Sequence, residues 1–67
     1  MKTQIVDIEI TLAGIAMIYG VTARGIAWLK SHVDFEPWQV QAGGIACEPG
    51  MATSIRDGAE NDGLIVS

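Results

Sequence analysis

The residues in this 67-residue chain that could carry chemistry are one cysteine, one histidine, eight acids and four bases. Catalysis needs a nucleophile or an acid–base group that is held in place by partners. Cys47 follows Ala46 in an apolar segment, which is typical of a buried, inert thiol. His32 falls at the end of a predicted helix, where a capping or solvated imidazole is the usual role. A Cys47–His32 pair stays open as an alternative, but no third residue is indicated to orient it, so we expect no enzymatic activity.

Metal and phosphate chemistry have equally little support. Asp57, Glu60 and Asp62 are clustered, but the segment DGAENDG lacks the ligand spacing of a calcium loop. Gly43 and Gly44 stand outside any GxGxxG or GK[ST] phosphate motif. We therefore predict no metal site, no cofactor and no catalytic residues.

The acids outnumber the bases, and the net charge is −4 with a pI near 4.5. This balance argues against direct binding to nucleic acid or to an anionic membrane, which both require a basic surface. Ordinary solubility explains a mild acid excess. The alternative is an acidic surface that competes for clefts lined with Lys and Arg.

The positions of the acids favour that alternative more than their number does. Asp7 and Glu9 are predicted on the outer face of the first strand, with carboxylates about 7 Å apart. The other acids fall in predicted turns, strand ends or helix ends, and they are Asp34, Glu36, Glu48, Asp57, Glu60 and Asp62. Trp38 is a further candidate contact because aromatic residues are common interface hot spots, although a core position is equally open for it. Trp28 is expected to be partly buried.

These residues are positioned by elements that the sequence pattern predicts. Residues 5–12 alternate, with Val6, Ile8, Ile10 and Leu12 on one side, and are predicted to form a half-buried strand. A break at residues 13–14 and an apolar run at 15–21 indicate a hairpin. Thr22 is a good N-cap for a helix over 23–32.

The second half of the chain repeats this order. Residues 38–42 alternate as a strand with Trp38, Val40 and Ala42 on one side, and 45–47 form a short apolar strand. A helix is predicted over 51–60, with Gly63 ending it, and residues 64–66 form a last strand. The order β-β-α-β-β-α-β predicts an α+β fold in which a mostly antiparallel sheet packs against two helices, in one domain over residues 1–67.

The size and the cysteine content bear on stability and location. A core this small supplies about 3–5 kcal/mol, so pairing with a second copy is a plausible source of stability. The uncharged run at residues 10–23 is too short to span a bilayer, and two acids precede it where a signal peptide has none. A lone cysteine also suits a reducing compartment. We expect a cytoplasmic protein that does not bind membranes.

Three segments resemble a group of very small proteins from bacteria, prophages and plasmids. They are TARGIAWL at 22–29, GGIACEP at 43–49 and IRDGAENDGLIV at 55–66. Size, acidity and this mobile-element character are also similar in type to the anti-CRISPR proteins of phages. That resemblance implies a non-enzymatic inhibitor acting in the cytoplasm of a bacterial host, whose acidic surface blocks the DNA-binding groove of a type I CRISPR effector.

Two alternatives stay open beside this hypothesis. One is a small structural or regulatory homodimer that pairs through a sheet edge or Trp38. The other is a protein whose activity depends on the Cys47 thiol.

Overall fold

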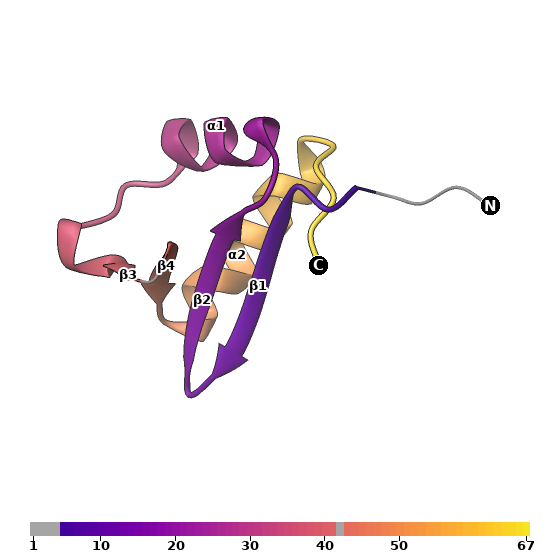
Figure 1. The fold of residues 1–67 in the computed structure, drawn as a ribbon. Coiled ribbons are helices and arrows are strands. Elements are labelled where there is room, and N and C mark those ends of the chain that lie inside the picture. Colours follow the sequence, from indigo (N-terminus) through magenta and orange to yellow (C-terminus); the bar gives the residue numbers. More distant parts are fainter. Residues whose placement is uncertain (1–4, 42) are drawn as a thin grey trace.

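A computed structural model describes residues 5–41 and 43–67 of the chain. It confirms the predicted α+β class, with two helices and an antiparallel sheet in the order β1-β2-β4-β3 (Figure 1). The strands are β1 (Ile8–Ala13), β2 (Ile15–Gly20), β3 (Val40–Gln41) and β4 (Gly44–Cys47). The helices are α1 (Ala23–His32) and α2 (Pro49–Asn61), and a 3-10 turn, η1 (Pro37–Gln39), precedes β3.

The hairpin and the first helix confirm the predictions from local residue chemistry. Gly14 adopts a φ of 81° between β1 and β2, a conformation that glycine reaches without a steric penalty. Thr22 caps α1, since its Oγ1 accepts a hydrogen bond of 3.0 Å from the Gly25 amide. The helix spans 23–32, as predicted.

The second helix begins two residues earlier than predicted. Pro49 occupies its first turn. Backbone amides in the first turn have no acceptor within the helix, so proline, which lacks an amide proton, loses no hydrogen bond there, and its fixed φ suits a helix. Gly63, with a φ of 88°, follows its end as predicted. The expected last strand is reduced to a single parallel bridge between Ile8 and Val66.

The segment predicted as a strand over 38–42 differs most, and its residue 42 lies outside the described residues. Gln39 is buried, whereas Trp38 is 65% and Val40 52% exposed, so the polar side of the alternating run faces inward and the open question of Trp38 is answered by exposure. The reason is the Gln39 amide: it accepts from the Glu36 amide at 2.7 Å and donates to the Ala46 carbonyl at 3.1 Å. These bonds satisfy backbone groups and favour a 3-10 turn followed by only two strand residues.

The core lies between the sheet and α2, which crosses behind β1 and β2 (Figure 1). Ile8 and Ile18 are fully buried in it, against Ala52, Ile55 and Ala59 of α2. Leu12, which alternation placed on the same side, is 67% exposed. It belongs to the end of the hairpin, which extends beyond α2 in Figure 1.

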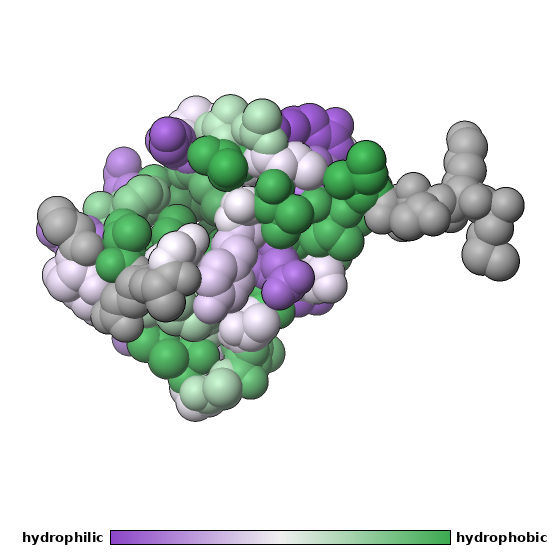
Figure 2. Space-filling view, in the orientation of Figure 1, coloured by the Kyte–Doolittle hydropathy of each residue, from purple (hydrophilic) through white to green (hydrophobic). Residues whose placement is uncertain are grey.

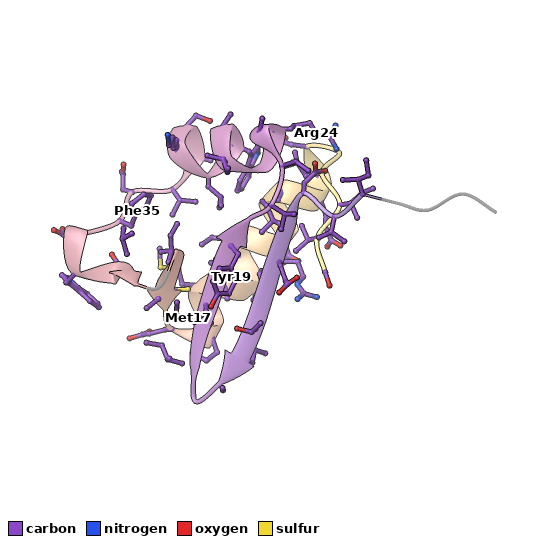
Figure 3. All side chains as sticks on the ribbon, in the orientation of Figure 1. Met17, Tyr19, Arg24 and Phe35 are labelled. Atoms are coloured by element: carbon purple, nitrogen blue, oxygen red, sulfur yellow. The ribbon has the colours of Figure 1, made fainter. Side chains whose placement is uncertain are left out.

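Among the residues that the structure describes, no helix covers the other face of the sheet (Figure 1). Met17 and Tyr19 point out of β2 toward this open face (Figure 3). A Cβ atom at Gly44 would lie 2.6 Å from the Tyr19 ring, so the absence of a side chain there lets the tyrosine ring pack closely over β4. Figure 2, drawn from this side, shows a mixed surface with hydrophobic residues toward the hairpin end.

Candidate interface around the second helix

Asp7 is not part of an acidic surface. The sequence predicts it on the outer face of β1 beside Glu9, and this prediction is wrong, because Asp7 precedes the strand and is 5% exposed. Its carboxylate accepts hydrogen bonds from Arg24 at 2.6 Å, from the Thr22 hydroxyl at 2.6 Å and from the Ile65 amide at 3.0 Å. Asp7 therefore joins the start of the sheet, the start of α1 and the C-terminal segment.

The electrostatics of Asp7 agree with this structural role. The Arg24 guanidinium, together with the donors of Thr22 and Ile65, holds the pKa of the carboxyl well below its usual range. Arg24 also donates to the Gly63 carbonyl at 3.0 Å, and it lies beside the C-terminal segment in Figure 3. Setting this ion pair aside leaves seven acids and three bases in the chain to act on a partner.

The remaining acids are exposed but do not form a single patch. They are Glu9, Asp34, Glu36, Glu48, Asp57, Glu60 and Asp62. Glu9 alternates with buried Ile8 and so lies on the open face of the sheet, opposite α2. Glu36 belongs to the connection before η1. The structure thus separates these two acids from the group around α2.

The α2 acidic face is centred on Asp57 and Glu60, and two further exposed acids lie at the ends of the helix. Asp57 and Glu60, three residues apart, are neighbours on the helix surface and point away from buried Ile55. Glu48 and Asp62 are the residues at the two helix caps. At a rise of about 1.5 Å per residue, these acids extend along roughly 20 Å. Over residues 48–62 they are accompanied by one base, Arg56.

An open groove of about 400 Å³ separates α1 from this helix. Its lining includes Trp28, His32, Asp34, Met51, Ser54 and Gly58. Trp28 and Met51 supply apolar surface, and Asp34 adds a carboxylate on the α1 side. No local sequence pattern marks this groove, because it forms only where two helices distant in sequence meet.

Asp62 connects the groove to the end of α2. Its carboxylate accepts a 2.7 Å hydrogen bond from the Trp28 indole and lies 3.6 Å from His32 Nε2. The His32 ring stacks on Trp28, with ring centroids 4.5 Å apart. An acid at a helix C-terminus opposes the helix dipole, and the hydrogen bond from the Trp28 indole offsets part of that cost. The expected partial burial of Trp28 is confirmed.

Cys47 is buried, as predicted, with 4% of its surface exposed. Burial, and then the neighbouring Glu48 carboxylate, raise the pKa of the Cys47 thiol. A reactive cysteine needs the opposite shift, toward the thiolate. His32 lies instead against Trp28, Ser31 and Asp62.

Within residues 5–41 and 43–67, no three His, Cys, Asp or Glu side chains come together as metal ligands. In the same residues, neither helix has the length and apolar character needed to cross a bilayer.

The chain was also compared with known proteins. No protein-family model matches it, and neither the curated proteins nor the solved structures contain a significant match.

Proposed function

We propose that this protein is a non-enzymatic inhibitor that binds a basic, nucleic-acid-binding surface of a host complex in the bacterial cytoplasm. The contact surface is the α2 acidic face, and a type I CRISPR effector is the target class suggested by the resemblance to anti-CRISPR proteins. The observation that carries the proposal is the exposed pair Asp57 and Glu60 on the outer surface of α2, with a further exposed acid at each helix cap.

The surroundings of this face support a protein partner. Met51, which is 37% exposed, and Trp28 line the neighbouring groove. Apolar side chains of a partner can be buried against them, as in the core of a protein interface. Asp34 lies on the far side of the same groove. A segment that combines Lys or Arg with an apolar anchor therefore matches the site in both charge and polarity.

Occupation of such a segment by carboxylates excludes nucleic acid, because the same Lys and Arg side chains neutralise phosphates in the active complex. The attraction acts between solvent-exposed charges, so it weakens as salt shortens the screening length. The inhibitor should therefore compete with target DNA, and its affinity should fall with ionic strength.

The test is DNA capture by a purified type I effector that has been incubated with the protein. The wild type should reduce capture of fluorescent target DNA. The D57K/E60K variant should reach the same inhibition only at a protein concentration at least about tenfold higher. The E9K/E36K variant makes the same change in net charge away from α2 and should inhibit like the wild type. Equal loss in both variants would show a net-charge effect, and undiminished DNA capture with wild type would remove this target class.

A homodimer is the second candidate, and exposed apolar residues favour it. Leu12 and Ile15, at the hairpin end, are 67% and 47% exposed, and Trp38 is 65% exposed. Large apolar side chains exposed at a hairpin end and beside a sheet edge offer contact surface to a second copy. The L12K/I15K variant should then be monomeric at concentrations where the wild type has twice the mass by light scattering, whereas D57K/E60K should keep the wild-type mass.

A further inference from the structure

A second concave site, separate from the α2 acidic face, lies between α1 and the sheet edge formed by β4 and β3. It is a recess of about 300 Å³ with an apolar lining that includes Ile18, Ile26, Leu29, Phe35, Val40 and Ile45. Figure 2 shows hydrophobic side chains between α1 and this edge, and Phe35 extends from the connection after α1 on the side of β3 in Figure 3.

The depth of the recess follows from which residues form its floor. Ile18, Leu29 and Ile45 are at most 7% exposed, whereas Ile26 and Val40 at the opening are 42% and 52% exposed. The floor thus belongs to the core and the rim to the surface.

Gly20 helps to shape the recess where α1 approaches β2. A Cβ atom there would come within 2.6 Å of Ile26 Cγ1, so the missing side chain lets α1 approach β2 while Ile26 reaches the recess. Because α2 packs behind β1 and β2, it does not close the opening on the β3 side (Figure 1).

The charge at the recess has the opposite sign to that of the chain. Lys30 is the charged residue in its lining, and the described part of the protein offers it no ion-pair partner. Its aliphatic stem can follow apolar surface while the ammonium stays in water. The groove between the helices differs, since Asp34 and His32 line it.

We propose that this recess binds a medium-chain carboxylate, with the alkyl chain against the apolar floor and the carboxylate at Lys30. A volume of about 300 Å³ equals that of about ten liquid waters, which suits an alkyl chain of about eight to ten carbons. A site of this size is at the lower end of those that hold small molecules. Apolar burial sets the affinity, and the ammonium selects an anion over a cation.

The test is a titration of the full, isotope-labelled chain with sodium hexanoate, octanoate and decanoate, followed by amide chemical shifts. Saturable shifts should centre on Gly20, Gly43 and Gly44, which line the recess. Decanoate should bind with a Kd on the order of 0.1–1 mM. Affinity should fall about fourfold for each methylene removed.

Matched controls distinguish binding at this recess from nonspecific hydrophobic binding. K30Q should weaken decanoate binding about two- to fivefold, whereas R56Q, which removes a base beside a separate apolar depression of about 320 Å³ near Leu12, should not. V40W should obstruct the opening and reduce binding, and its amide spectrum reports whether the fold is kept.

Three results would overturn the proposal: equal binding of decyltrimethylammonium, affinity that does not depend on chain length, or shifts centred on Leu12 and Arg56.

Discussion

Replacing Gly25 with alanine tests how closely the start of α1 packs against the start of the sheet. A Cβ atom at this position would overlap the carbonyl oxygen of Asp7 and lie 2.8 Å from its carbonyl carbon. That carbonyl accepts the Val21 amide at 2.8 Å. Because both obstructing atoms are backbone, no side-chain rotation can make room for the methyl group.

Two opposing effects set the magnitude. Alanine favours the helix over glycine by about 1 kcal/mol. Forcing a methyl group into filled space costs about 1–3 kcal/mol, and loosening the Val21 hydrogen bond adds about 1 kcal/mol. The balance is a loss of about 1–3 kcal/mol in the free energy of unfolding. In a domain of this size, that lowers the melting temperature by about 5–20 °C.

The matched control is Gly50→Ala in the first turn of α2. A Cβ atom there has nothing within 4 Å, so the helix preference should raise stability by up to about 1 kcal/mol. Urea and thermal unfolding followed by circular dichroism measure both variants. If Gly25→Ala is as stable as the wild type while Gly50→Ala gains stability, the close approach of α1 to Asp7 is refuted.

Three further predictions concern the other contacts that hold the fold together. Because the pKa of Asp7 is lower in the folded protein than in the unfolded chain, its stabilising effect is present above its ordinary pKa and is lost as the pH falls below it. Thermal melts between about pH 5 and pH 2 should therefore show a decline that Asp7→Asn makes shallower, and an unchanged slope would contradict the role of this carboxylate. Asp62→Ala should have a free energy of unfolding about 0.5–1 kcal/mol lower than Asp62→Asn in urea titrations, since both remove the charge but only asparagine keeps an acceptor for the Trp28 indole; equal stability of the two variants would mean that the bond is not kept in solution. The Cys47 thiol should react with a thiol reagent only after unfolding, because it is buried and its pKa is raised, so rapid labelling of the native protein would count against the described core.

Local chemistry predicted those elements whose ends depend on single residues. Thr22 specifies the start of α1 by its hydroxyl, and Gly14 and Gly63 specify turns by their φ angles. Each of these interactions involves residues within three or four positions of one another, so the local sequence is sufficient to predict it.

The errors arose where distant residues decide the conformation. Asp7 has an acidic side chain in an alternating run, but Arg24, 17 positions away, draws it out of solvent. Gln39 has a strand-like context, but its amide is held by Glu36 and Ala46. Alternation contains no information on such partners.

The candidate surfaces also differ in whether neighbouring or distant residues determine them. The pattern of the second helix predicted that Asp57 and Glu60 would be exposed at its end, and they are. The groove beside Trp28 and the recess beside Lys30 depend on how α1 packs, which no spacing in the sequence encodes. The partner of the α2 acidic face stays a prediction.

The most direct test of that prediction is inhibition of DNA capture by a type I effector, measured across a salt series for three proteins. The wild type and E9K/E36K should inhibit at low salt and lose potency together as salt rises, while D57K/E60K should be at least about tenfold weaker at low salt and change little with salt. Inhibition by D57K/E60K that equals the wild type, with the same salt dependence, would contradict the assignment of the interface to α2.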